Sequence, residues 1–298
     1  MGKILYILAF NILTISIVAQ SNIRINNHLE NPYYINPAAI DDDGSLVLSM
    51  TARKQWIGFP GSPATIYATG TTYLENIRAQ FGVKIFNDKI GISNTFNIAL
   101  SYAYSVKLHT NWQLHLGIAA SYQNLSYDLS DLSSSSIDDP TFNSKLLKDN
   151  NYNSDAGAQL TNKEFTVGIS SLNLLSIFFE ENKIQNNANY LYAKYRYVTP
   201  DPINVQGGIT AIQFNRSIQM EYNLTAFFNS YRHKDIFQIG LFYRTQSEMG
   251  TIFGLNLGDL MHLWYSFDYN VSGISRNTVG THEIMLVYKL DKQLSRNY

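Results

Sequence analysis

Long stretches of alternation between large apolar residues and small or polar ones constrain this chain more than any other feature. From Phe96 to Leu108 every second residue is apolar, and the residues between them are Asn, Ala, Ser and Lys. A period of two is the side-chain period of a β-strand. Similar stretches run from 112 to 123 and from 219 to 228. Only residues 109–111 separate the first two stretches, which therefore predict a long hairpin.

The length of these stretches favours a membrane over water. Soluble strands average about five or six residues, whereas a tilted strand needs about 9 to 11 to cross a bilayer. Ser, Ala, Gly, Gln and Asn on the second face suit an enclosed lumen better than a wetted sheet. We therefore predict an all-β, transmembrane antiparallel up-and-down β-barrel of about fourteen strands, with a soluble β-sandwich as the weaker alternative. The predicted strands are 45–55, 63–73, 79–87, 95–108, 111–124, 153–161, 164–171, 188–197, 203–214, 216–229, 235–244, 250–258, 261–270 and 281–290.

The lengths of the predicted connections agree with this interpretation. Bacterial barrels have short turns on the periplasmic side and long loops on the outer side. The three longest predicted connections, 125–152, 172–187 and 271–280, all follow odd-numbered strands. They therefore belong on one rim of the barrel.

The N-terminus resembles an export signal. Residues 1–19 combine Lys3, an apolar stretch and a small residue at Ala19, which is typical of a cleaved signal peptide. The alternative, a membrane anchor, is weaker because Asn11, Thr14 and Ser16 interrupt the stretch. Residues 20–44 are expected to form a periplasmic tail or a partial plug in the lumen, and 45–298 the barrel. The predicted location is the outer membrane of a Gram-negative bacterium.

Composition excludes several classes of function. Charged residues make up 15% of the chain, the net charge is −1 and the pI is about 6.6, so the chain lacks the basic field that nucleic-acid binding requires. The chain has no cysteine, which excludes disulfides, thiolate catalysis and Cys-ligated zinc.

No motif for catalysis, metal or cofactor binding was found in the sequence. The six histidines do not follow a metal-ligand spacing, and neither a GxSxG elbow nor a glycine-rich phosphate loop occurs. We therefore predict a protein that is not an enzyme, with no catalytic residue, no metal and no cofactor. An outer-membrane hydrolase is kept as a minor alternative.

One polar stretch at the end of the first predicted strand is a candidate site. Side chains alternate between the two faces of a strand, so if Met50 and Ala52 point outward, Arg53 and Gln55 point toward the lumen. Trp56 then lies at the rim of the barrel. Trp56 is expected in the aromatic girdle of the barrel, with partner binding as the alternative. Arg53 is expected either in partner binding or in an internal ion pair with an inward carboxylate such as Glu221 or Asp268.

Several sequence blocks resemble the PorP/SprF family of type IX secretion system outer-membrane proteins. The most specific are Arg53-Lys54-Gln55-Trp56-Ile57-Gly58-Phe59-Pro60-Gly61-Ser62-Pro63 and Gly280-Thr281-His282-Glu283-Ile284. Weaker blocks are Asn36-Pro37-Ala38, Asp88-Lys89-Ile90-Gly91, Asp139-Pro140-Thr141-Phe142, Gly240-Leu241-Phe242-Tyr243-Arg244 and Tyr265-Ser266-Phe267-Asp268-Tyr269. The charged tail from Leu290 to Tyr298 departs from this pattern.

The resemblance implies a barrel that serves protein export, attachment of secreted adhesins or gliding motility. The implied partners are the C-terminal domain of a secreted surface protein or adhesin, motor components in the periplasm, and outer-membrane lipid. The implied role is either a motor-associated component or, as we favour, a dedicated partner of one exported protein. A channel for a small or hydrophobic solute is the rival function. The residues carried over as partner-binding or structural are Arg53, Gln55, Trp56, Gly58, Phe59, Asp139, Pro140, Arg244, Asp268, His282 and Glu283.

Overall fold

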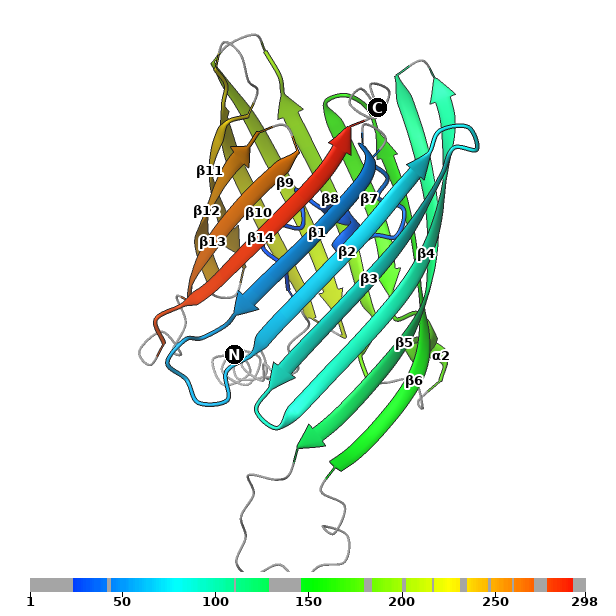
Figure 1. Cartoon of the computed structure of the whole chain (residues 1–298), viewed down its shortest axis with the longest axis vertical. Coiled ribbons are helices and arrows are strands. Elements are labelled where there is room, and N and C mark those ends of the chain that lie inside the picture. The colour runs from blue at the N-terminus through cyan, green and yellow to red at the C-terminus, as the bar shows by residue number, and fades with distance from the viewer. Residues whose placement is uncertain are drawn as a thin grey trace, which may run out of the picture.

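Fourteen antiparallel strands close into a single barrel in the computed structural model (Figure 1). The structure describes residues 24–41, 44–109, 111–128, 146–179, 184–199, 202–215, 217–230, 235–245, 248–258, 260–270 and 278–291. The strands are β1 Gly44–Lys54, β2 Ala64–Leu74, β3 Ala79–Ile90, β4 Ser93–His109, β5 Trp112–Asp128, β6 Leu146–Thr161, β7 Phe165–Leu172, β8 Ala188–Tyr197, β9 Ile203–Phe214, β10 Ser217–Phe228, β11 Phe237–Arg244, β12 Glu248–Leu257, β13 Met261–Asn270 and β14 Thr281–Asp291. The predicted fold class is confirmed.

Each strand pairs with its neighbours in sequence, and β1 pairs with β14 to close the wall. Closure satisfies the backbone donors and acceptors that an open edge would expose to hydrocarbon. Two short helices occur among the described residues, the 3-10 helix η1 (Pro32–Tyr34) and α2 (Leu175–Phe178). In the described part of the chain no helix has the length and apolarity needed to span a membrane.

The two faces of the wall are opposite in chemistry. Along β11 exposed and buried residues alternate without exception, with Leu241 at 59% exposure beside Phe242 at 3%. On β4 Leu100 is 67% exposed whereas the neighbouring Ser101 is buried. The outward face thus carries large apolar side chains, as the period of two predicted, whereas the inward face carries most of the buried polar residues together with some aromatic ones such as Phe242.

The structure corrects the predicted boundaries around the longest loop. The sequence predicted a loop over 125–152, but β5 continues to Asp128 and β6 begins at Leu146, with Asn124 opposite Asn150 in the ladder. Residues 148–151 of β6 are all polar and carry no alternation signal, yet the backbone ladder continues because its hydrogen bonds need no apolar side chain. The strand ends that the three longest connections join, β5 to β6, β7 to β8 and β13 to β14, lie at one end of the barrel, as predicted.

We call the end of the barrel that bears the three longest connections the long-loop rim, and the opposite end the short-turn rim. The short-turn rim carries the connections 75–78, 110–111, 162–164, 198–202, 229–236 and 258–260. In Figure 1 the end of β14 lies at the short-turn rim, at the top of the view.

Residues 24–41, the lumenal segment, run inside the barrel against the inner face of the wall (Figure 1). Asn26, Asn36 and Ala38 have no exposed surface. Ion pairs and hydrogen bonds tie the start of the segment to residues near the long-loop rim, and Asp41, at its other end, pairs with Lys289 near the short-turn rim. Residues 1–19 lie outside the described residues, so the signal peptide stays a prediction.

Candidate functional site

A cluster of buried charges lies inside the barrel toward the long-loop rim. Arg53 on β1 contacts Asp268 on β13 through Nη2 at 2.7 Å and Glu283 on β14 through Nη1 at 3.0 Å. The side chains of all three residues are at most 3% exposed. The predicted inward orientation of Arg53 is confirmed. Of the ion pairs that the sequence left open, with Glu221 or with Asp268, the structure has the one with Asp268.

Arg244, at the end of β11, neutralises the other half of the cluster. Its Nε donates to Glu221, its Nη1 lies 2.9 Å from Glu248 and 3.7 Å from Asp268, and its guanidinium lies over the ring of Phe242. Glu221, which the sequence offered as an alternative partner of Arg53, therefore pairs with Arg244 instead. Charges buried at this depth persist only when they are paired and hydrogen-bonded.

The cluster also holds the beginning of the lumenal segment. Arg244 Nη2 donates to Asn26 Oδ1 at 2.6 Å, and the backbone N–H of Asn26 donates to Glu283 at 3.0 Å. The Asn26 amide donates to Ser266 and Asp268, and the Asn27 amide donates to Glu283 at 3.0 Å. Sequence analysis missed Asn26 and Asn27, because a polar pair ahead of the first strand carries no period or motif.

Further along, the lumenal segment is fastened to the wall by neutral hydrogen bonds. The Tyr34 hydroxyl lies 2.6 Å from Ser49 Oγ and 2.7 Å from Thr51 Oγ1. Burial raises the pKa of Tyr34 to about 12. Asn36, in the weak Asn36-Pro37-Ala38 block, donates to the Ala158 carbonyl at 3.1 Å and to the Tyr192 hydroxyl.

Glycines in the wall make room for this segment. A Cβ added at Gly117 of β5 would lie 2.5 Å from the backbone of Pro37 and Ala38. One added at Gly157 of β6 would lie 2.0 Å from Asn36 Oδ1, and one at Gly208 of β9 would lie 2.3 Å from Leu29 Cδ1. A side chain at these positions would occupy the space of the segment, so wall and segment are complementary in shape.

The two most specific family blocks meet at the long-loop rim. Arg53 pairs in register with Glu283, and Lys54 with His282. The Ile57 N–H donates to the Gly280 carbonyl and the Val279 N–H donates to the Ile57 carbonyl, both at 2.9 Å. The connection from 55 to 63 is therefore docked on the residues that lead into β14.

The remaining predicted site residues that the structure describes lie near this rim. Gln55 and Trp56 are half-buried, and Phe59 is 52% exposed. Trp56 and Gly58 adopt positive φ angles of 47° and 98° in the turn that follows β1. His282 bonds the Tyr265 hydroxyl at 2.7 Å. Asp139 and Pro140 lie outside the described residues, and the partner-binding roles of these residues, like the girdle role of Trp56, stay predictions.

The closed antiparallel wall carries exposed apolar side chains on its outer face, and the charges buried inside it are paired or hydrogen-bonded. These features define this chain as an outer-membrane β-barrel. It belongs to the PorP/SprF family of type IX secretion system membrane proteins, whose family model matches residues 17–288. The resemblance seen in the sequence is thereby confirmed.

Solved structures of similar shape are outer-membrane barrels. Omp33 of Acinetobacter baumannii has 9% identity and a TM-score of 0.48, covering 83% of this chain and 98% of its own. The toluene transporter TbuX of Ralstonia pickettii has 8% identity and a TM-score of 0.49, covering 87% and 92%. A FadL homologue of Pseudomonas aeruginosa has 9% identity and a TM-score of 0.46, covering 85% and 92%. No curated protein matches. Similarity this distant says nothing about what this chain binds.

Proposed function

We propose that this barrel is a binding and scaffold component of type IX secretion. Its long-loop rim receives the C-terminal domain of an exported surface protein, such as an adhesin, and helps to export or anchor it. The mechanism is recognition and not bond chemistry, and the protein is not an enzyme. Family membership supports a role in this secretion system, whereas the dedicated partner is our proposal.

The observation that carries the proposal is the organisation of the long-loop rim. The longest connections share this rim, and the connection 55–63 is held there by backbone hydrogen bonds to Val279 and Gly280. Phe59 stands exposed on this docked connection. A fixed loop that presents an exposed aromatic ring is the kind of anchor that dominates protein interfaces.

The lumenal segment favours a scaffold function over a channel function. We propose that residues 24–41 act as a partial plug, because they occupy the lumen from the ion cluster to Asp41. The short-turn rim then remains for contact with periplasmic motor components.

The test is capture of a partner from outer membranes by the tagged barrel. Phe59→Ala should abolish or strongly reduce the capture of a secreted surface protein, while Ile77→Ala, an exposed apolar residue on the short-turn rim, should leave the capture unchanged. Equal capture by both variants would contradict the role of the long-loop rim. Capture of no secretion-system protein at all would contradict the scaffold.

The rival function is tested by conductance in planar bilayers. The intact barrel should pass no solute, and a variant lacking residues 24–40 should conduct. Solute flux through the intact barrel without a partner would favour a channel.

A further inference from the structure

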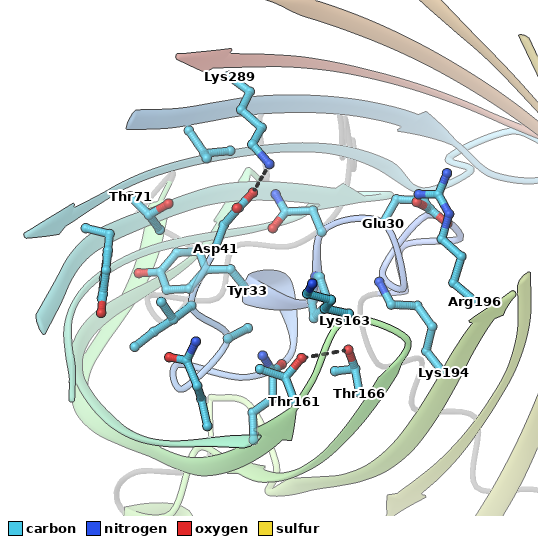
Figure 2. A pocket seen from close by; sticks show the side chains of 18 of the residues that line it. Glu30, Tyr33, Asp41, Thr71, Thr161, Lys163, Thr166, Lys194, Arg196 and Lys289 are labelled. Carbon is cyan, nitrogen blue, oxygen red and sulfur yellow. Dashed lines mark hydrogen bonds and ion pairs between the residues drawn. The ribbon is translucent and has the colours of Figure 1, made fainter. Parts of the chain in front are cut away.

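At the short-turn rim the lumenal segment forms the floor of a cavity of about 790 Å³ (Figure 2). Glu30, Tyr33 and Asp41 of the segment line it from below, and strand ends and short turns form its walls. Its volume lies within the roughly 300 to 1,000 Å³ of typical ligand pockets. A ligand can therefore enter from this rim and stop at the segment.

Among the charged residues of the lining, cations are in excess. The cationic lining residues are Arg78, Lys107, Lys163, Lys194, Arg196 and Lys289, and the carboxylates are Glu30, Asp41, Glu75 and Asp235. Lys289 pairs with Asp41 at 2.9 Å and Arg196 with Asp235 at 2.5 Å. The Lys194 ammonium donates to the Leu29 carbonyl at 2.8 Å. These three cations are engaged by the protein itself.

The other three cations form what we call the basic crescent, Arg78, Lys107 and Lys163. They lie on or beside the turns 75–78, 110–111 and 162–164, which follow one another around the wall between β2 and β7. All three are exposed. Within the described part of the chain, none of them has a carboxylate within 4.0 Å. The lining as a whole carries six cations and four carboxylates. An excess of cations in a concave site concentrates anions there.

We propose that this cavity binds an acidic peptide segment of a periplasmic protein. Short turns of such barrels face the periplasm, so the opening meets macromolecules of that compartment. Cations on three successive turns match a chain with several carboxylates better than a single small anion. The proposal rests on the outer-membrane placement of the barrel and is independent of recognition at the long-loop rim.

The experiment measures binding of fluorescein-labelled hexaglutamate to the full barrel in lipid nanodiscs, where both rims are accessible. The peptide should bind, and binding should weaken as salt rises. K107Q/K163Q should weaken binding by at least about fivefold, as loss of two exposed charge pairs implies. The matched control K89Q/K148Q removes two exposed lysines near the long-loop rim and should bind like the unchanged protein.

Three results would overturn the proposal. The first is no binding of hexaglutamate at low salt. The second is an equal loss in K107Q/K163Q and K89Q/K148Q, which would indicate a non-specific charge effect. The third is displacement of the peptide by inorganic phosphate at equal concentration, which would assign the site to small anions. Because F59A leaves this rim intact, it should bind hexaglutamate normally even if surface-protein capture is lost, so the two proposals fail separately.

Discussion

At Glu283 one carboxylate serves two functions. It pairs with Arg53 across the β1–β14 seam and accepts the backbone N–H groups of Asn26 and Asn27. Arg244 is used in the same way, because it neutralises Glu221 and Glu248 and also donates to Asn26. The charges that pair within the wall therefore also fasten the lumenal segment, so a substitution at Glu283 or Arg244 affects both.

Replacing Arg244 by Met should lower the free energy of unfolding by about 3 to 5 kcal/mol, because the buried Glu221 would lose that cation and the half-buried Glu248 would lose its nearest one. Urea unfolding of the barrel in lipid vesicles, followed by tryptophan fluorescence, measures the change. E221Q/R244M should recover part of the loss. Arg78→Gln, at an exposed position, should change the unfolding free energy by no more than about 0.5 kcal/mol. Similar losses in R78Q and R244M would contradict the cluster argument.

The inner face of the wall is complementary in shape to the lumenal segment. Gly207 and Gly208 on β9 illustrate this, since a Cβ at Gly207 would meet nothing within 4 Å while one at Gly208 would meet Leu29. At Gly117 the obstacle is the backbone of Pro37 and Ala38, which cannot rotate away as a leucine side chain can. Adding a methyl group should therefore cost the most free energy at Gly117, less at Gly208 and least at Gly207.

Gly117→Ala should displace the segment, with Gly208→Ala intermediate and Gly207→Ala without effect. Because the chain has no cysteine, Ile35→Cys provides a unique, buried probe for maleimide labelling. The labelling rate should rise at least about tenfold in G117A, the factor that corresponds to an overpacking cost of about 1.4 kcal/mol. Equal labelling rates in G117A and G207A would show that the glycine does not position the segment.

Over the whole molecule the distribution of polar and apolar side chains is the reverse of that in a soluble protein. Leu100, Ile118 and Leu241 are among the most exposed residues, whereas Arg53, Arg244 and Glu283 are among the most buried. In water this arrangement would expose a large apolar surface, which soluble proteins avoid. In a bilayer the same surface faces hydrocarbon and the interior can hold polar groups.

Leu100→Arg should therefore cost about 2 to 4 kcal/mol, the penalty for a lipid-facing cation near the bilayer centre. Leu108→Arg, near the end of the same strand, should cost only about 0 to 1 kcal/mol, because its side chain can reach the interface. Both free-energy costs are measured by unfolding the two variants in lipid vesicles of different bilayer thickness. Equal costs at the two positions would argue against a bilayer around β4.

The strands and the faces they present could be predicted from the sequence because both depend on a local period of two. The fourteen predicted strands match those observed, and the error around 125–152 arose where polar residues such as Lys148 and Asn150 hid a continuing ladder. The family blocks identified Arg53, Arg244, Asp268 and Glu283, but their grouping into one cluster could not be derived from spacing.

What the sequence alone determined is thus the wall: its strand count, its outward and inward faces and the rim that bears the long connections. The tertiary structure is needed to show how the lumenal segment fits the wall and which of the alternative charge pairs form. Arg53 and Glu283 are 230 residues apart and become neighbours only when β1 pairs with β14. Gly117 and Pro37 meet only across the lumen. Such contacts depend on closure and register, which are properties of the whole chain and leave no local pattern.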